Sequence, residues 1–487
     1  MRITNRMMMT QTLNNVNKSK YNLSTAENQM STEKKITRPS DDPIIAIRAL
    51  SLRASLSDID QYLNHNIPDA ESWIDVTESA MNNMDSILSD IYQYCNQGAS
   101  DQFTETDRSA IIDVLKQYKN ALYSEADTNY AGRYCFSGYK TDSAFTFLTS
   151  VDAKKEYEIT QKFTVDDISK TEVMKNSVNI SNVGHISAGD TPETRSVYRF
   201  RLAYEACEDN GFSDFVVDGT SYTPTAVSKD EFEELVSNGL FDNATNSVYY
   251  IYDTGEMAFT DDLYTTFKEA EDVSFTYRKD GFKAGEPRPE MYFNCTNLTD
   301  DIEYTQNEGG QIISYVINFN QSIQVNTLGN ETLSYDIGRD IDDLCAALQA
   351  VLDVETKITR LKDMKDSSVY NDVEKENIQS MIEACEKEKD FAVDAMEELF
   401  SKEITKVSKY QQIVDLQLAD VGARKTRLTL TKSRLTEQYT TFKDLKSKNE
   451  DVELEEVVIE FSSAQTLYQA ALTAASNCVQ QSLLDYI

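Results

Sequence analysis

The sequence contains little proline, little histidine and no long apolar segment. Only seven prolines occur among 487 residues, and none follows Pro289. The two histidines, His65 and His185, stand in no HExxH motif and beside no candidate nucleophile, so we interpret both as ordinary surface or loop residues. No segment approaches the roughly 18 apolar residues in succession that span a membrane. We therefore expect neither a histidine-based catalytic centre nor a membrane partner.

Motifs of common enzyme and metal sites are also missing. The chain has no phosphate-binding Walker loop, no dinucleotide fingerprint and no nucleophile elbow. Its paired acids lack the alternating ladder of a calcium loop, so they are interpreted as solvated carboxylates or helix caps. We therefore expect no enzyme activity, no catalytic residue, no cofactor and no metal site. The paired acids are Asp41 with Asp42, Asp166 with Asp167, Asp300 with Asp301, and Asp342 with Asp343.

The cysteines form no recognisable framework. They are odd in number, widely scattered and never arranged as CxxC, whereas disulfide scaffolds and zinc sites show tighter spacing. We predict unpaired thiols, several of them buried as small hydrophobic side chains. The seven cysteines are Cys95, Cys135, Cys207, Cys295, Cys345, Cys385 and Cys478.

The charge is strongly negative and unevenly distributed. A net charge of −35 argues against a nucleic-acid partner, because binding to phosphates depends on Lys and Arg. Residues 1–53 nevertheless carry nine Lys or Arg and four Asp or Glu, whereas residues 449–487 carry seven acids and no base. The N-terminus has basic residues but no long apolar run and no small-residue cleavage site, so it does not resemble a secretory signal. By these signals alone the chain would be cytosolic.

Helical periodicity dominates the first 126 residues. The decapeptide "KKITRPSDDP" (34–43) separates two helices, and Asp41 and Asp42 are interpreted as turn and N-cap residues before Pro43. The second helical run extends from Ile45 to Tyr94 through Pro68, where a bend rather than a reversal is expected because the heptad phase continues. A returning helix is predicted at residues 112–126. The predicted first seam is Met9, Leu13, Val16, Lys20, Leu23, Glu27 and Met30.

The middle of the chain has a different texture. Between about residues 144 and 333, alternating and aromatic segments such as "SVYYIYDTGEMAF" predict strands and hairpins, with one short helix at 228–241. Long helices return after Gly338, because only one glycine and no proline follow it. The predicted fold class is mainly α with a β-rich insert. Both chain ends would form a long antiparallel helical coiled-coil rod, and the insert would be an α+β or β domain.

The terminal seams bury little area. The C-terminal seam consists of Val457, Phe461, Ala464, Tyr468, Ala471, Ala475 and Cys478, and small side chains barely offset the entropy of ordering about 30 residues per end. Copies of the same chain would supply the missing contacts. The sequence thus predicts a structural subunit whose ends order on assembly.

Five segments together resemble one family. "MRIT", "ITRPSDDP", "GRYCFSGYKTDSAF", "VGARKTRLTLTKSRL" and "SLLDYI" resemble, in this order, the flagellins and their hook-associated relatives over roughly residues 1–147 and 405–487. Family members usually have Gly two positions after the Ser of the segment before the loop, where this chain has Glu33. The middle of the chain lies outside the resemblance.

The resemblance implies a structural role outside the cell. It implies a subunit exported unfolded through the flagellar type III apparatus, without a cleaved signal, that forms a ring-like zone joining hook to filament. Its partners would be itself, a neighbouring hook-associated protein, flagellin and an export chaperone. A flagellin-type filament subunit is the alternative. An enzyme carried on such a frame is a third reading, against which the missing HExxH argues.

Three parts are expected on this basis. Residues 1–38 with 450–487 would form a terminal coiled-coil (inner tube) domain, 39–143 with 334–449 a helical rod domain, and 144–333 an outer β-rich domain. Antiparallel ends would bring the basic residues Lys34, Lys35 and Arg38 close to the acids Glu453, Glu455 and Glu456. The expected assembly residues are Ile3, Met9, Leu13, Val16, Leu23, Met30, Asp41, Asp42, Leu467, Leu483, Leu484 and Ile487.

Overall fold

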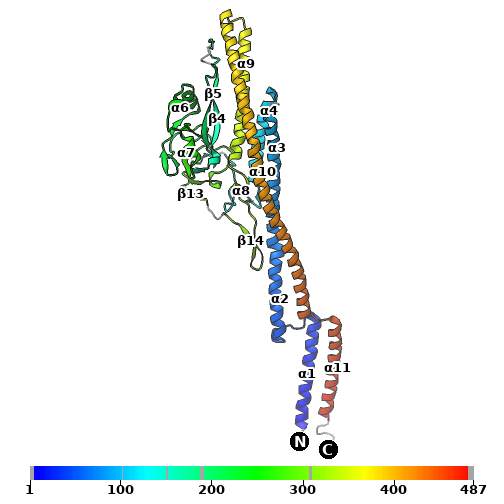
Figure 1. The fold of residues 1–487 in the computed structure, drawn as a ribbon. Coiled ribbons are helices and arrows are strands. Elements are labelled where there is room, and N and C mark those ends of the chain that lie inside the picture. Colours follow the sequence, from blue (N-terminus) through cyan, green and yellow to red (C-terminus); the bar gives the residue numbers. More distant parts are fainter. Residues whose placement is uncertain are drawn as a thin grey trace, which may run out of the picture. The chain divides into compact units, whose positions relative to one another are not determined.

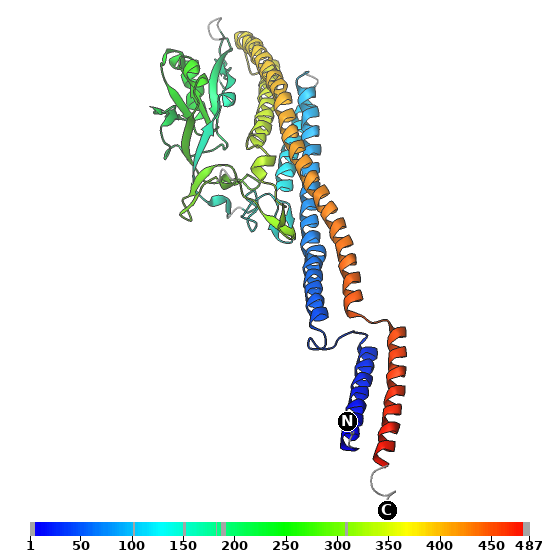
Figure 2. The same cartoon turned by 60° about the horizontal axis from the view of Figure 1, so that its bottom comes forward.

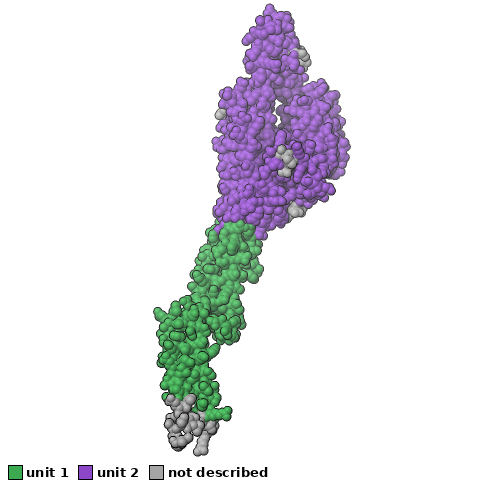
Figure 3. Space-filling view, turned by 180° about the vertical axis from the view of Figure 1, so that it is seen from behind, with its two compact units in different colours: residues 1–70, 315–323, 426–487 green, residues 71–314, 324–425 purple. Residues whose placement is uncertain are grey.

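The computed structural model describes residues 5–100, 103–149, 152–181, 183–186, 191–306 and 310–480. The chain divides into two compact units, coloured separately in Figure 3. Unit 1 comprises residues 1–70, 315–323 and 426–487, and unit 2 comprises residues 71–314 and 324–425. The predicted fold class is confirmed, since the helices come from the two ends of the chain and the sheets from its middle.

Unit 1 contains the two terminal helices (Figures 1 and 2). Helix α1 (Asn5–Thr32) and helix α11 (Leu454–Gln480) lie side by side and antiparallel, so that the start of α1 and the end of α11 are at the same end of the pair. Helix α2 (Pro43–Gln61) follows the predicted loop. Helix α10 (Asp372–Glu450) contributes its last 25 residues to this unit.

The second helical run passes Pro68 without interruption, as predicted. Helix α2 leads into a π-helical turn at Tyr62–Asn66 and then into α3 (Ile67–Gly98). The amide of Ile67 donates to the carbonyl of Tyr62, five residues back, one position before the proline. A π turn widens the helix at the place where proline has no amide to donate and its ring crowds the preceding turn. The sequence predicted that the helical run continues past Pro68, but it did not predict the π-helical turn.

Unit 2 combines helices with the β-rich insert. Helix α4 (Glu105–Ala126) begins with a capping box between Thr104 and Asp107, and it packs against α9 (Asp336–Asp366). The prediction of free thiols is confirmed for the six cysteines at positions 95, 135, 207, 295, 345 and 385, all of them buried. Burial raises the pKa of the Cys345 thiol to about 11.

Two sheets of the insert enclose an aromatic core. One sheet has the strand order β4-β5-β10-β9-β8, with β8 and β9 parallel, and the other has the order β13-β12-β3-β11-β6-β7. Side chains from both sheets, among them Phe200, Phe215 and Phe275, form one fully buried cluster. The strands are β3 (Tyr157–Phe163), β4 (Ser169–Lys175), β5 (Glu193–Arg201), β6 (Phe215–Val217), β7 (Thr220–Tyr222), β8 (Thr225–Val227), β9 (Val248–Ile251), β10 (Glu256–Phe259), β11 (Val273–Lys279), β12 (Asn294–Asn297) and β13 (Ile302–Tyr304).

Smaller elements complete the description of the insert. The predicted hairpin at 247–259 is β9 and β10, and the predicted short helix is α5 (Lys229–Ser237). Three further helices were not predicted, because four or five residues are too few to show helical periodicity. Two-stranded hairpins occur at β1 (Asn129–Tyr130) with β2 (Arg133–Tyr134) and at β14 (Ser314–Asn318) with β15 (Gln321–Gln324). The three short helices are α6 (Leu240–Asn243), α7 (Tyr264–Lys268) and α8 (Gly329–Thr332).

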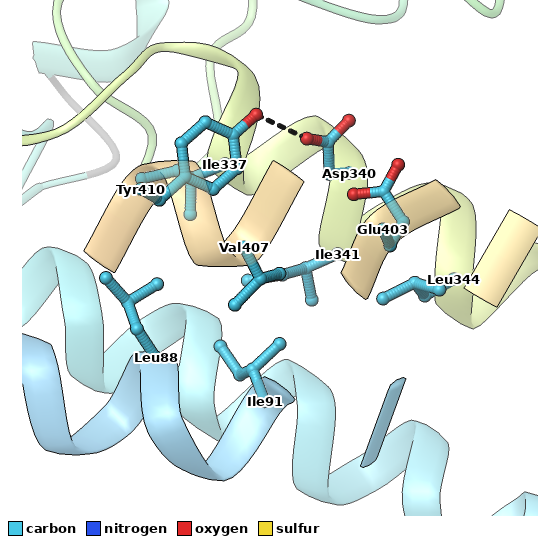
Figure 4. Close-up of a pocket in the computed structure, with 9 residues that line it drawn as sticks. All are labelled: Leu88, Ile91, Ile337, Asp340, Ile341, Leu344, Glu403, Val407 and Tyr410. Atoms are coloured by element: carbon cyan, nitrogen blue, oxygen red, sulfur yellow. Dashed lines mark hydrogen bonds between the residues drawn. The ribbon is translucent and has the colours of Figure 1, made fainter. Parts of the chain in front are cut away.

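A buried ionic cluster joins the insert to the helices within unit 2. Arg201 of β5 contacts Asp343 at 2.8 Å and also pairs with Asp340, both on α9. On α10, the Lys406 ammonium lies 2.9 Å from Asp340, and the Tyr410 hydroxyl donates to Asp340 at 2.5 Å (Figure 4). The interpretation of Asp343 as a solvated carboxylate or cap is therefore wrong, because its partner Arg201 comes from a strand 142 residues away in the sequence.

Glu403 is the residue of this cluster whose ionisation destabilises the folded state. Its side chain is only 1% exposed, its Oε1 lies 2.9 Å from Lys406, and its Oε2 has no hydrogen-bond partner. Burial, with repulsion by Asp340 as the next cause, raises the pKa of Glu403 to about 7. The folded state must therefore ionise a buried acid above neutral pH, which opposes folding.

Glu403→Gln is expected to stabilise unit 2 increasingly as pH rises from about 4 to 7. A raised folded-state pKa adds stability below the unfolded value of about 4.3, and this stability is lost as pH rises from there through 7. The amide removes that loss, so we expect a gain of about 3 kcal/mol near pH 8 and only about 1 kcal/mol near pH 5. Denaturant unfolding at the two pH values measures it, and a gain that does not depend on pH would contradict the ionisation argument.

Candidate assembly interface

The contact seam of α1 runs through small and apolar side chains. Val16, Leu23 and Met30 lie in it as predicted, but Lys20 and Glu27 are exposed. Lys20 and Glu27 therefore do not interrupt the seam, because the residues before them, Ser19 and Ala26, lie in it instead. The seam consists of the partly or fully buried residues Thr12, Val16, Ser19, Leu23, Ala26 and Met30, and Thr25 and Gln29 beside it are also partly buried.

The contact seam of α11 agrees with the prediction. Val457 is buried, and Phe461, Ala464, Tyr468, Ala471 and Ala475 are partly buried, at alternating spacings of four and three residues. The side chain of Cys478 lies outside the described ones. Both helices therefore meet along one heptad seam of modest area.

Large apolar side chains are exposed on both helices of this pair. The expected assembly residues Met9, Leu13 and Leu467 are 44%, 57% and 60% exposed. Ile3, Leu483, Leu484 and Ile487 lie outside the described residues. Surface of this kind marks an interaction site when it is contiguous. The large apolar side chains exposed on the two helices are Met7, Met8, Met9, Leu13, Tyr21, Leu454, Val458, Ile459, Leu467 and Leu472.

Helix α11 is uncharged over most of its length. Its acids, Glu455, Glu456 and Glu460, lie in the first two turns, and residues 461–480 contain no Asp, Glu, Lys, Arg or His. A helix that meets water on three sides normally carries charges there. No helix among the described residues is both long and apolar enough to cross a membrane. The composition of α11 suits a helix that protein surrounds.

A clasp, defined here as residues 33–42 with residues 450–453, connects the terminal pair to α2 and α10. The amide of Lys35 donates to the carbonyl of Glu450 at 2.7 Å, and the amide of Val452 donates to the carbonyl of Glu33 at 3.2 Å. Lys34 and Asp451 face one another as an antiparallel bridge. Backbone hydrogen bonds thus join the segment between α1 and α2 to the segment between α10 and α11.

Charged side chains reinforce the clasp. Glu450 is buried and accepts two bonds from Arg53, at 2.7 and 2.6 Å, while Lys34 lies 3.7 Å from it. Lys34 also pairs with Asp451, and Lys35 donates to the carbonyl of Lys448 at 2.6 Å.

The predicted antiparallel direction is confirmed, but the predicted acidic partners are wrong. Glu453, Glu455 and Glu456 are exposed, because the acids that meet the lysines lie at the end of α10 and not at the start of α11. Arg38 makes no ion pair among the described residues. The role of Arg53 was missed, since nothing in its local sequence marks it.

Glu33 adopts a left-handed backbone conformation. Its φ is 56°, in the region that favours glycine. The resemblance pointed to glycine at this position, so the chain keeps the turn despite the side chain. Such a residue costs on the order of 1 kcal/mol or more, and it persists only where the surroundings impose it. The bond from Val452 to the Glu33 carbonyl is one such constraint.

Asp41 and Asp42 have the predicted local roles. Asp42 is the N-cap of α2 and accepts from the amides of Ile44 at 2.9 Å and Ile45 at 3.1 Å. Asp41 accepts from the amides of Arg38 and Thr37, and the Arg38 bond is the main cause that lowers its pKa. Both carboxylates shape the loop of the clasp.

Glu450→Ala is expected to loosen the clasp by about 2–3 kcal/mol, because Arg53 and Lys34 lose a buried charged acceptor. The half-exposed Arg53 recovers some hydration, which limits the loss. Hydrogen exchange at the Lys35 and Val452 amides measures it. Glu437→Ala, an exposed position on the same helix, should change protection by less than about 0.5 kcal/mol; unchanged exchange in Glu450→Ala would refute the role assigned to Glu450.

The paired terminal helices, their exposed apolar surface and the β-rich insert define a class of protein, a subunit that assembles through its chain ends. The bacterial flagellin N-terminal helical region matches residues 3–141, and the bacterial flagellin C-terminal helical region matches residues 400–487. The chain belongs to the flagellin family.

Individual relatives agree with this placement. Flagellar hook-associated protein 3 of Salmonella typhimurium is 29% identical over 145 residues, which are 30% of this chain and 45% of the relative. The flagellin of Clostridium tyrobutyricum is 30% identical over 126 residues, 26% of this chain and 33% of the relative. The matches thus span less than half the length of these relatives.

One solved structure matches the chain over most of its length at low identity. The putative flagellar hook-associated protein from Vibrio parahaemolyticus is 15% identical and covers 84% of this chain and 100% of its own, with a TM-score of 0.36. A score this low adds nothing about the fold or the function of this chain.

Proposed function

We propose that the chain is a structural subunit of the bacterial flagellum that forms the junction between hook and filament and is required for filament attachment. The observation that carries the proposal is helix α11, which has no charged residue from 461 to 480, packs against α1 over a thin seam and leaves apolar side chains exposed for further copies. The relative named flagellar hook-associated protein 3 favours the junction over the filament. The role is structural and not enzymatic.

The partners follow from this role. The chain would contact copies of itself in a ring, a neighbouring hook-associated protein, flagellin and an export chaperone. It would act outside the cell, reached through the flagellar export apparatus without a cleaved signal. The assembly residues on α1 and α11 would be Met9, Leu13, Val16, Leu23, Met30 and Leu467, together with Ile3, Leu483, Leu484 and Ile487 beyond the described ends. Asp41 and Asp42 would act indirectly, by shaping the clasp.

We also propose a functional division of the chain. Residues 1–38 with 450–487 would form the inner tube, 39–143 with 334–449 the helical rod, and 144–333 the outer domain. The clasp at the border of the first two parts supports this division.

Electron microscopy of a deletion strain tests the function. We expect hooks without filaments and flagellin released into the medium, with attachment restored by the intact gene. Filaments that remain attached in the deletion strain would refute the proposal. A filament subunit, the alternative, predicts no secreted flagellin at all and a copy number far above that of the hook subunit.

A further inference from the structure

The two flanks of the terminal helix pair differ in charge. At about 100° per residue, Met9, Leu13 and Lys20 lie about 60–100° to one side of the α1 seam. Leu454, Val458 and Leu472 lie on the same side of the antiparallel α11. We call this the basic flank. The opposite side, formed by Glu456, Glu460 and Leu467 of α11, is the acidic flank.

Other charges do not cancel this difference. Arg6 lies beyond Leu13 on the basic flank, and Glu27 lies on the same flank near the clasp. Lys18 lies at the outer edge of the acidic flank, about 120° from the seam of α1. Among the described residues the basic flank keeps a net charge of +1 and the acidic flank a net charge of −1.

Three charges of the two flanks have no ion-pair partner among the residues that the structure describes. Lys20, Glu456 and Glu460 are exposed, and none of them forms an ion pair among the described residues. The bridge between Lys34 and Asp451 places Lys20 at the level of about residue 465. Glu460 and Glu456 lie on the other flank and about 7–14 Å away along the axis. Their partners must come from another molecule if the pair is surrounded by protein, since buried charges need partners.

We infer that copies of this chain pack side by side, the basic flank of one against the acidic flank of the next, with Lys20 paired to Glu456 and Glu460 of its neighbour. The inference rests on the proposed function and names its self-contact. Leu13 and Leu472 of one copy meet Leu467 of the next in the same contact. Two different surfaces are joined, so the contact is heterologous and repeats into a ring or helix. The axial offset of about 7–14 Å sets the stagger between neighbours.

A charge exchange in the full-length chain tests this contact. Lys20→Glu is expected to reduce the fraction of cells with filaments at least about tenfold, and Glu456→Lys with Glu460→Lys should have a similar effect. Combining the three substitutions restores opposite charges at every interface and should recover at least half of wild-type attachment. Glu455→Lys, the matched control next to Glu456, lies about 160° from the α11 seam and off both flanks, so it should keep attachment near wild type.

Cross-linking gives a second readout. Carbodiimide treatment of isolated hook–filament structures should yield Lys20–Glu456 or Lys20–Glu460 links in a dimer-sized band, and the free subunit should yield none. Failure of the triple exchange to recover attachment, together with the absence of these links, would overturn the inference. The presence of the wild-type chain at hook tips reports on the proposed function separately, and it is unaffected by either outcome.

Discussion

Flagella are expected to lose their filaments when aspartate replaces Ala464, with attachment reduced at least about a hundredfold. Ala464 lies in the α11 seam, at the level of about residue 21 of α1. A carboxylate there has no cationic neighbour in the seam, and burying an unpaired charge costs more than this thin seam provides. The α1–α11 pair should open, and its protection against hydrogen exchange should disappear in the free subunit.

Thr466→Asp provides the control. Thr466 is exposed and faces away from the seam of the same helix. The free subunit should therefore keep its protected helix pair when this residue is changed. If Ala464→Asp and Thr466→Asp left the pair equally protected, the seam described here would be wrong.

Asp340→Ala is expected to destabilise unit 2 by about 3–5 kcal/mol, the largest stability effect expected in the chain. The change leaves Arg201, which is 10% exposed, and Lys406 without their common acceptor. Removing one partner of a buried ion pair is costly because the other charge remains desolvated. Burial alone would raise the pKa of Asp340, but attraction by Arg201 and Lys406 together with the hydrogen bond from Tyr410 holds this pKa below its usual value, consistent with a carboxylate that is charged in the fold.

Thermal and denaturant unfolding measure this loss. Asp363→Ala, at an exposed position of the same helix, should stay within about 0.5 kcal/mol of the parent. A double variant, Arg201→Met with Asp340→Leu, should cost less than the sum of the two single changes, because the two partners of one ion pair are removed together. A loss of less than about 1 kcal/mol in the free energy of unfolding for Asp340→Ala would contradict the proposed contribution of the cluster to stability.

Local sequence signals predicted the helices and their caps well. Asp42 before Pro43 marked the start of α2, and the lack of proline and glycine marked α10. Only part of the α1 seam could be predicted, because Val16, Leu23 and Met30 fit two different heptad patterns. One pattern continues through Lys20 and Glu27, and the other, which the structure adopts, continues through Ser19 and Ala26. The larger apolar residues Met9 and Leu13 favoured the path that the structure leaves exposed. In a free subunit, small residues at the contact let two helices approach closely, and the larger ones remain outside.

Contacts between residues far apart in the chain could not be predicted from the sequence. Neither the pairing of Arg53 with Glu450 nor that of Arg201 with Asp343 has a local signature. The strand order of the insert is likewise set by packing of aromatic side chains from both sheets around one core, which alternating patterns do not specify. Asp343 therefore looked like one more surface acid.

The position of the clasp makes the two ends of the helix pair unequal. At the clasp, backbone hydrogen bonds join the two connecting segments, so pairing of the adjacent helical turns costs little loop entropy. Between residues 5–12 and 471–480, the described residues nearest the other end, no such backbone hydrogen bond occurs. The helix pair should therefore open first at the end away from the clasp. Residues 5–12 and 471–480 should exchange amide hydrogens fastest and meet proteases first, with protection increasing steadily toward Met30 and Val457.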